Sequence, residues 1–372
     1  MVHYFRNNIK THVYIGRDDL LLLSKTNILK NMHERHVVYC PYEPDYFLEY
    51  SKFSRELENI PNDHPLRDNF YHVFLAHDYT DLRKVEKSRG PSFSKNSNWS
   101  MFYMHYSTSR FINENPGYQN SDDPSKLFCC LNKNPKIHRM AAIKTLDDLN
   151  LFDKGAITWL PTDREKQALE FLSAQHADYF NGATAIKHLE NKIYSEPNAS
   201  LEGDWICRCP NIYKDCLFDI VTESEWEICM WSEKTARPLL LGKPFVILGG
   251  RNSNTELKKF GFESYDEFFN INEEINLSHV LEDRIDYDFD VYGKILKPLC
   301  AIDEDLTVYK NILQSLQPKI KHNQSVFIRT LFDDSLIPEL VWEIPREHNK
   351  YLNRILDTRI EILNHKYYKQ FI

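Results

Sequence analysis

The stretch that decides the fold class is MWSEKTARPLLLGKPFVILGG, residues 230–250. Its last part, PFVILGG, is a short apolar run that ends in two glycines. Such a run, closed by a turn signal, predicts a buried strand. The residues before it read as a short apolar helix. The stretch as a whole therefore predicts a helix that leads directly into a buried strand.

The start of this helix carries an unusual set of polar residues. Pro238 would remove a hydrogen bond deep in a helix but is tolerated in the first turn, so we expect Thr235 to be the N-cap. Glu233 and Lys234 then lie on the approach to the helix. A carboxylate there can accept hydrogen bonds from ribose hydroxyls, and a lysine can meet a phosphate as a point charge. A surface ion pair beside an ordinary cap is the alternative interpretation.

The rest of the chain repeats this alternation of strand and helix. Apolar runs typical of strands are THVYIG (11–16), HVVYCP (36–41), YHVFLAHD (71–78), WSMFYMHYS (99–107), KLFCCLN (126–132), AITWL (156–160) and DCLFDIVTE (215–223). Helix-like segments cover 18–34, 134–152, 306–330 and 340–370. Strands that alternate with helices predict an α/β fold with mainly parallel sheets.

The length of 372 residues predicts two domains of ordinary size. Residues 111–126 are polar and rich in turn formers, which is typical of a linker between domains. We therefore expect an N-terminal domain over 1–125, a C-terminal domain over 126–345 and a final helix over 346–372.

Charge and hydropathy limit the possible partners. The formal net charge is −8 and the isoelectric point is about 6.0, whereas a protein that coats nucleic acid is expected to be basic. The start of the chain has no apolar signal-peptide core, and no apolar run is long enough to span a bilayer. We expect a cytoplasmic protein without a membrane partner.

A metal site is not expected from the residues that could form one. Cys207, Cys209 and Cys216 lack the usual two-residue spacer of a zinc site, and the eight cysteines form no dense disulfide framework. We read them as free thiols. The segment DYDFD, residues 286–290, has an Asp-x-Asp spacing but lies in an acidic stretch that is typical of a solvated edge.

A second strand end carries polar residues that suit a phosphate. In CCLNKNPKIHR the strand is expected to stop at Leu131, with Asn132, Lys133 and Asn134 in the loop that follows. Asn134 would cap the next helix, and Arg139 would lie one turn into it. A helix N-terminus with nearby cations has the main features of a phosphate-binding site. A capped helix with solvated cations is the alternative.

The segment TESEWEICMWSEKTARPLLLGKPFVILGG resembles the nucleotide-sugar motif of the α1,3-fucosyltransferase family. That motif reads Phe-Glu-Asn-Ser, a short gap, Tyr-[Ile/Val]-Thr-Glu-Lys, a helix, then Val-Pro-Val-Val and Gly. Ten positions separate its two glutamates, as they separate Glu223 and Glu233 here. The resemblance covers about residues 126–270. It is closer to glycosyltransferase-like proteins of phages and large viruses than to the animal enzymes, which implies the host cytoplasm of a virus or phage as one setting. Ser224 replaces the family's Asn and Met230 its Tyr, which leaves the base and the sugar open.

The resemblance implies a GT-B fold, in which two Rossmann-like domains with parallel sheets face a central cleft. It implies a glycosyltransferase that takes a sugar from a GDP- or UDP-linked donor, without a metal or other cofactor. By this resemblance Glu233 contacts the ribose, Lys234 and Arg139 contact the diphosphate, and Glu223 matches the first glutamate of the motif. Asn132, Lys133 and Thr235 complete the expected donor site.

The resemblance also implies inverting transfer, in which an acceptor hydroxyl attacks the anomeric carbon and a general base takes its proton. The base should lie at a strand end of the N-terminal domain. His77 and Asp78, which end the run YHVFLAHD, are the best-placed pair, with a solvated turn as the alternative. Lys234 and Arg139 would stabilise the charge of the leaving diphosphate.

Three classes of function remain open. The first is a glycosyltransferase that acts on a glycan, a protein or a small molecule. The second is a glycosyltransferase that modifies hydroxymethylated bases of phage DNA, which must reach the base and needs a basic groove. Four cations could form a local patch of this kind: Lys84, Lys87, Arg89 and Lys95. The third is a catalytically inactive GT-B binding module, which turnover of a sugar nucleotide would exclude.

Overall fold

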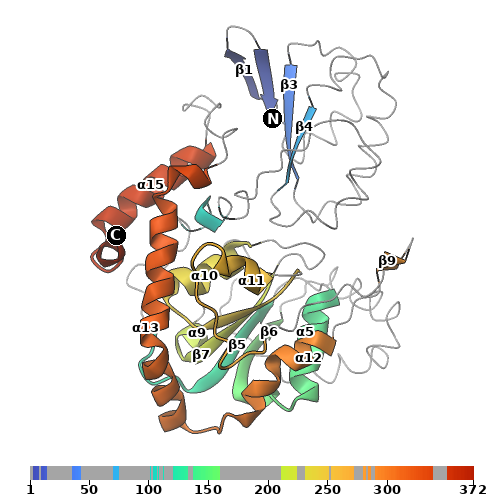
Figure 1. The fold of residues 1–372 in the computed structure, drawn as a ribbon, viewed down its shortest axis with the longest axis vertical. Helices are drawn as coiled ribbons and strands as arrows, with labels where there is room; N and C mark the ends of the chain where they lie inside the picture. The colour runs from blue at the N-terminus through green and yellow to red at the C-terminus, as the bar shows by residue number, and fades with distance from the viewer. Residues whose placement is uncertain are drawn as a thin grey trace. The chain divides into compact units, whose positions relative to one another are not determined.

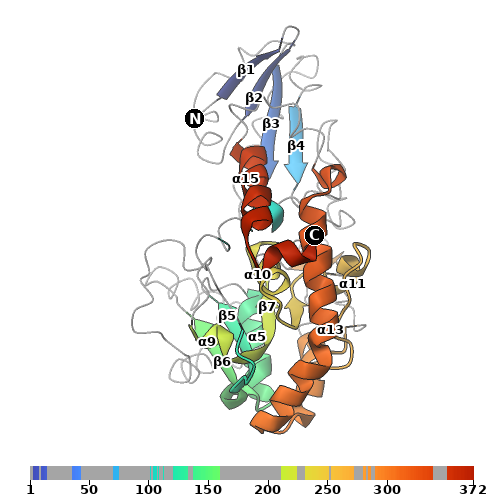
Figure 2. The same cartoon turned by 90° about the vertical axis from the view of Figure 1, so that its left-hand side faces the viewer.

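The computed structural model describes most of the C-terminal part of the chain and a few strands of the N-terminal part. The described residues are 3–7, 10–14, 36–42, 70–74, 101, 104–106, 108, 112, 120–132, 137–159, 211–223, 231–250, 253–271, 280–281, 284–285, 290–337 and 350–372. The chain divides into two compact units (Figures 1 and 2). Unit 1 comprises residues 1–103 and 334–354, and unit 2 comprises residues 104–333 and 355–372.

Unit 1 contains a four-stranded sheet in the order β1-β2-β3-β4. Strands β2 (Lys10–Tyr14), β3 (His36–Tyr42) and β4 (Phe70–Phe74) are parallel to one another, as their apolar runs predict. The first ten residues contain no apolar run that would predict a strand. There β1 (His3–Asn7) pairs antiparallel with β2.

The run WSMFYMHYS, grouped above with the strands, is helical at its described positions, so that prediction is wrong. The buried residues of this region explain the error, because they recur at the spacing of one helix face. They are Met101, Met104, His105, Thr108 and Ile112. Aromatic and β-branched content alone does not separate a buried helix from a buried strand in so short a run.

Unit 2 contains a fully parallel four-stranded sheet in the order β6-β5-β7-β8. The strands are β5 (Lys126–Asn132), β6 (Gly155–Trp159), β7 (Cys216–Thr222) and β8 (Phe245–Leu248), which confirms the four predicted runs. Every residue of β7 and β8 is buried. Burial on both faces is what a parallel sheet covered by helices on each side requires.

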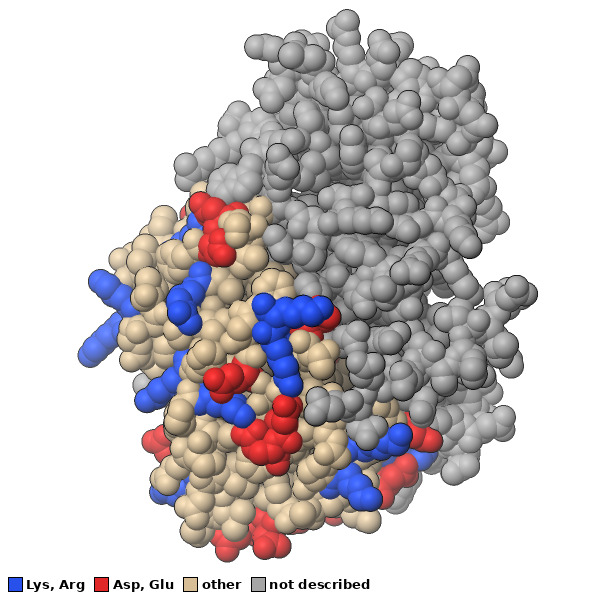
Figure 3. All heavy atoms as spheres, in the orientation of Figure 1, with Lys and Arg blue, Asp and Glu red and all other residues tan. Residues whose placement is uncertain are grey.

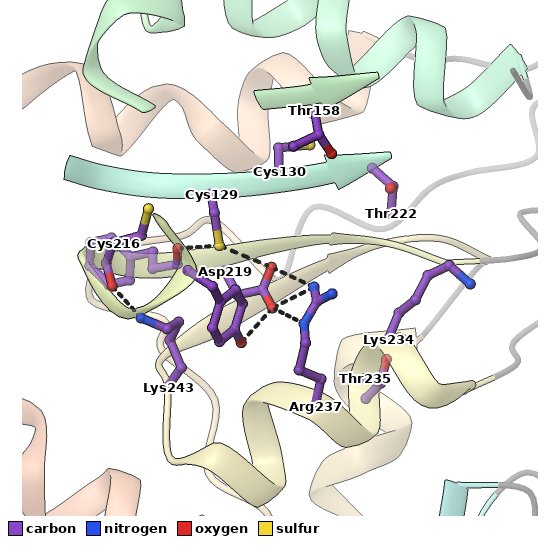
Figure 4. A network of polar contacts seen from close by, with 12 residues as sticks. Cys129, Cys130, Thr158, Cys216, Asp219, Thr222, Lys234, Thr235, Arg237 and Lys243 are labelled. Carbon is purple, nitrogen blue, oxygen red and sulfur yellow. Dashed lines mark hydrogen bonds and ion pairs between the residues drawn. The ribbon is translucent and has the colours of Figure 1, made fainter. Parts of the chain in front are cut away.

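Helices cover both faces of this sheet. Helix α5 (Ile137–Asp148) packs with α12 (Asp290–Leu296) on one face, and α10 (Glu233–Leu241) packs with α13 (Leu306–Leu331) on the other (Figures 1 and 4). The remaining elements are η5 (Phe152–Lys154), α9 (Asn211–Lys214), α11 (Ser253–Lys258), the pair β9 (Val280–Leu281) and β10 (Arg284–Ile285), η6 (Lys297–Ala301), η7 (Asp334–Leu336), α15 (Lys350–Asn364) and η9 (Tyr368–Phe371). The molecule is thus of the mixed α/β class.

The two predicted C-terminal helices correspond to α13 and α15. Helix α13 matches the predicted helix over 306–330 closely, whereas α15 begins at Lys350 and matches only part of 340–370. Among the described residues, no helix combines the length and the apolar character needed to cross a bilayer. The domain boundaries expected at 125 and 345 stay predictions.

The strand order of unit 2 contains a reversal that marks one place along the carboxyl-end edge of the sheet. The chain moves from β5 outward to β6, then returns across β5 to β7 and continues to β8. The order therefore reverses between β5 and β7. In open parallel sheets, ligands bind beyond the carboxyl ends of the strands at such a reversal. A ligand-binding site is therefore expected at the residues that follow β5 and β7.

A buried ion pair fixes α10 beneath β7 (Figure 4). The guanidinium of Arg237 on α10 donates to both carboxylate oxygens of Asp219 on β7, with an Nη2–Oδ2 distance of 2.9 Å. The hydroxyl of Tyr213 donates to the same carboxylate at 2.8 Å, and the thiol of Cys129 also points at it. Lys243 closes the network by donating to the carbonyl of Cys216. A carboxylate with no exposure needs such partners.

Candidate functional site

The carboxyl ends of three neighbouring strands are joined by polar side chains. The hydroxyl of Thr222, the last residue of β7, donates to Oδ1 of Asn132 at 2.5 Å. The backbone N–H of Asn132 donates to Oγ1 of Thr158 on β6 at 3.1 Å. Asn132 is the last residue of β5 and is only 1% exposed, so its predicted place in the following loop is wrong. Its side chain joins β5 to β7, and its main chain binds the Thr158 side chain on β6.

Glu223 follows β7 directly, and its carboxylate is fully buried. Oε1 accepts hydrogen bonds from the backbone N–H of Ser232 at 2.9 Å and from the hydroxyl of Thr235, and Oε2 accepts one from the hydroxyl of Ser232 at 2.6 Å. All three donors belong to the start of α10. Both oxygens of Glu223 are thus engaged by this helix.

The N-cap of α10 is Ser232, so the prediction of Thr235 for this position is wrong. Ser232 has an extended backbone, and its hydroxyl oxygen accepts from the backbone N–H of Lys234 at 3.2 Å. Thr235 is the third helical residue and is fully buried. The prediction required Pro238 to lie in the first turn. In the structure the buried residues of α10 and the contacts with Glu223 outweigh the hydrogen bond that Pro238 removes.

Glu233 and Lys234 form an ion pair at the start of α10. Nζ of Lys234 lies 2.7 Å from Oε1 of Glu233, and the two side chains are 16% and 15% exposed. Burial alone would raise the pKa of the Glu233 carboxyl, but the Lys234 charge and hydrogen bond, together with the Arg139 charge, hold that pKa below its ordinary value. Arg139 therefore lies close enough to act on Glu233. The pair is partly accessible, and the lowered pKa keeps the Glu233 carboxyl ionised near neutral pH.

Two side chains from α5 reach the same place. Nη2 of Arg139 lies 3.1 Å from the backbone carbonyl oxygen of Glu223, and Nε2 of His138 lies 2.8 Å from it. Because a carbonyl can only accept, the Nε2 atom of His138 carries the proton. Arg139 is 3% exposed. The main chain after β7 is thereby tied to the first turn of α5 as well as to α10.

The structure thus gathers most of the predicted donor-site residues at the strand-order reversal. They are Asn132, Arg139, Glu223, Glu233, Lys234 and Thr235 (Lys234, Thr235 and the strand ends are in view in Figure 4). Lys133, and the base candidates His77 and Asp78, lie outside the described residues, as do the cations proposed for a basic groove. Elsewhere on the described face, Lys and Arg are interspersed with Asp and Glu (Figure 3).

Sequence reasoning missed two residues of the site, Ser232 and His138. Ser232 could have been found, because serine is among the best N-cap residues and stands directly before the helix. His138 had no comparable signal. Its neighbour Arg139 stood out as a cation, but a histidine inside a helix indicates nothing about a main-chain carbonyl that lies far away in the sequence.

No group of side chains suited to a metal ion occurs among the described residues. Cys216 is a buried free thiol that donates to the carbonyl of Ile212 at 3.2 Å. Cys207 and Cys209, which were considered with it, lie outside the described residues. Of the Asp-x-Asp segment, Asp290 is described and begins α12.

Chemically, the site offers a lysine and a carboxylate with partial exposure and an arginine immediately behind them. Such a set can exchange its internal ion pair for the charges and hydroxyls of an anionic ligand. Comparison of the chain with models of known protein families, with curated proteins and with solved structures gave no match.

Proposed function

We propose that unit 2 binds a nucleoside diphosphate beyond the carboxyl ends of β5 and β7, and that the protein transfers a sugar from a nucleotide-diphosphate sugar to an acceptor hydroxyl. One observation carries the proposal. Arg139 from α5 and the Glu233–Lys234 pair from α10 meet where the strand order of a parallel sheet reverses. This is the position at which open α/β sheets bind their ligands.

Each of the three residues has a role in this proposal. Lys234 leaves the carboxylate of Glu233 and binds the diphosphate as a point charge. The carboxylate of Glu233, held ionised by its low pKa, then accepts hydrogen bonds from the ribose. Arg139 supplies a second positive charge close by. When the bond to the sugar breaks, negative charge grows on the diphosphate, and both cations stabilise it.

The proposal extends to the whole chain as a GT-B enzyme. Unit 1 supplies three parallel strands, which suits a second Rossmann-like domain on the acceptor side. The general base would be Asp78 or His77, which follow β4 in the sequence. Because two cations already face the leaving group, no divalent cation is required. Retention of turnover in EDTA tests this point, and activity that returns only with Mn²⁺ would contradict it.

The decisive experiment is a thermal-shift panel of GDP, UDP, ADP and CDP, followed by calorimetric titration of any nucleotide that shifts the melting temperature. A ligand at a hundredfold excess over its Kd stabilises a protein by about 2.7 kcal/mol, which is readily seen. Absence of a shift with all four nucleotides would contradict the proposal. Mass spectrometry of products from mixed acceptors, including DNA with hydroxymethylated bases, then separates the classes of acceptor.

A further inference from the structure

One residue at this site, Glu223, touches both helices that supply the charged side chains of the proposed nucleotide site. The carboxylate of Glu223 binds Ser232 and Thr235 at the start of α10. Its main-chain carbonyl accepts from His138 and Arg139 on α5. Its main-chain N–H donates to the carbonyl of Leu248 at the end of β8, at 3.2 Å. Three elements are thereby joined through a single residue.

The neighbouring main chain is shaped to admit this side chain. A Cβ placed on Gly249 would lie 3.0 Å from Cβ and 3.5 Å from Cγ of Glu223. Gly249 directly follows β8 and is buried. A larger residue there would press on the Glu223 side chain and move its carboxylate relative to α10. The chain that follows β8 therefore also helps to fix the position of the Glu223 side chain.

The charge of Glu223 also matters to the helix. The N-terminal end of a helix carries a partial positive charge, and an anion placed there is stabilised. In α10 that anion is a carboxylate of the protein, which has no exposure to solvent. The Glu223 carboxylate thus balances the partial positive charge at the start of α10 when no ligand is bound. A diphosphate would be met by the side chains of Lys234 and Arg139 and not by the backbone at this helix end.

We infer that Glu223 is the positioning residue of the donor site: it does not touch the ligand but holds Glu233 and Lys234 on α10 and Arg139 on α5 in register. The inference rests on the proposed nucleotide site. It predicts that nucleotide affinity depends on the hydrogen bonds between the Glu223 carboxylate and α10. Weakening these bonds at Thr235 should therefore lower the affinity as a change at Glu223 does.

The test compares Glu223→Gln, Thr235→Val and the double variant with the wild type. Glutamine keeps the size of the side chain, and valine keeps the shape of threonine, but each weakens the contact. Asp305→Asn is the matched control, because Asp305 caps α13 by accepting from the backbone N–H groups of Thr307 and Val308 and takes no part in the site. Three quantities are measured: the melting temperature, the Kd of the bound nucleotide, and hydrogen exchange over residues 232–237.

We expect Glu223→Gln to raise the Kd about tenfold, as loss of an orienting partner commonly does. The double variant should bind no more weakly than Glu223→Gln, because Thr235 acts through Glu223. Exchange over residues 232–237 should become faster while α13 is unchanged. Asp305→Asn exchanges one good N-cap residue for another at a helix start outside the site, so it should leave the Kd unaltered and change the melting temperature little.

Two results would overturn the inference. If the losses in affinity of the two single variants add in the double variant, Glu223 and Thr235 act on the nucleotide independently, and Glu223 does not act through its bond to Thr235. If Glu223→Gln lowers the melting temperature but leaves the Kd at the value of Asp305→Asn and the wild type, its role is confined to stability. A wild type that binds no nucleotide contradicts the proposed function instead. Hydrogen exchange in the unliganded protein then still decides whether Glu223 fixes the start of α10.

Discussion

At the scale of single residues, the polar side chains around the strand ends divide into two groups. Asn132, Glu223 and Thr235 are buried and bonded within the protein, whereas Glu233 and Lys234 keep partial exposure. Both groups are of the types that bind nucleotides. A polar group at the edge of a buried sheet must be satisfied when no ligand is present, so the same residue types serve as structural partners.

The first residue-scale prediction concerns Lys234. Replacing Lys234 by alanine should lower kcat/KM for a sugar nucleotide by about 2–4 kcal/mol, because its contact strengthens as the leaving group gains charge. Lys258→Ala is the matched control, since Lys258 on α11 forms only an exposed ion pair with Asp266 at 3.0 Å. Side-by-side kinetics and melting curves provide the measurement. Equal activity of both variants would show that the Glu233–Lys234 pair is only part of a helix start.

The second residue-scale prediction concerns His105. Burial, and then the charge of Arg359, lower the pKa of His105 to about 3, although Asp333 opposes the shift. Its Nε2 atom lies 3.1 Å from Oγ1 of Thr330, and its ring lies near Phe327. The folded state therefore keeps His105 neutral at pH values at which the unfolded chain binds a proton.

Because the folded pKa lies below the unfolded value, stability is lost as the pH falls below about 6.5, by up to about 1.4 kcal/mol per pH unit from this one group. His105→Gln should remove that part of the slope while it retains a polar partner for Thr330. Denaturant unfolding of both proteins between pH 4 and pH 7 measures it. Parallel curves for wild type and variant would assign the acid sensitivity to other groups.

At the scale of elements, α10 is a short helix that is held at both ends and from below. A helix of nine residues is marginal by itself, so its position is set by tertiary contacts. At its C-terminal end Gly242 adopts a left-handed conformation with φ of 67°, which favours glycine. Asn120 donates to the carbonyls of Leu241 and Gly242, and Gln324 on α13 donates to that of Leu240.

The pair between Arg237 and Asp219 provides the element-scale prediction. Arg237→Met should lower the free energy of unfolding by about 3–5 kcal/mol, because it leaves the Asp219 carboxylate buried without its cation. The double variant Asp219→Leu with Arg237→Met should recover a large part of this loss, since it removes the buried charge as well. Urea unfolding of the three proteins is the measurement. A single variant as stable as the wild type would show that Tyr213 and Cys129 are sufficient partners.

At the scale of the whole molecule, unit 2 is built from two separate parts of the chain. The C-terminal part packs along α13, where Nε of Arg359 donates to the carbonyl of Leu331 at 2.6 Å. The hydroxyl of Tyr367 donates to Oε1 of Gln324 at 3.1 Å, and Gln324 in turn binds the end of α10. The last residues of the chain are thereby linked to the helix that begins at the candidate site.

Two isoleucines on α15 test this packing of the C-terminal part on unit 2. Ile362 is fully buried in unit 2, whereas Ile360 is 57% exposed on the same helix. Ile362→Ala should lower the free energy of unfolding by about 2–5 kcal/mol through lost burial and a cavity, and Ile360→Ala should change it by less than about 0.5 kcal/mol. Chemical denaturation of both variants measures the contrast. Equal effects would mean that the C-terminal part does not pack on unit 2 as described.

The sequence by itself determined the α/β class, the four strands of the unit 2 sheet and the long helix α13. These features follow from local patterns: apolar runs closed by glycine, and helical spacing over many residues. The same locality explains the failures. The strand β1 lies in a polar stretch with no such run, and the helical residues between 101 and 106 read as a strand because their run is short.

Only the tertiary structure decided which polar residues at the strand ends remain accessible. The sequence placed Glu223, Thr235 and Asn132 beside Glu233 and Lys234 without ranking them. Folding brings Glu223 from the end of β7 to the start of α10, where the helix dipole and three donors take up its charge. Whether a carboxylate meets a ligand or a helix depends on partners in a different element, and only the packed fold brings them together.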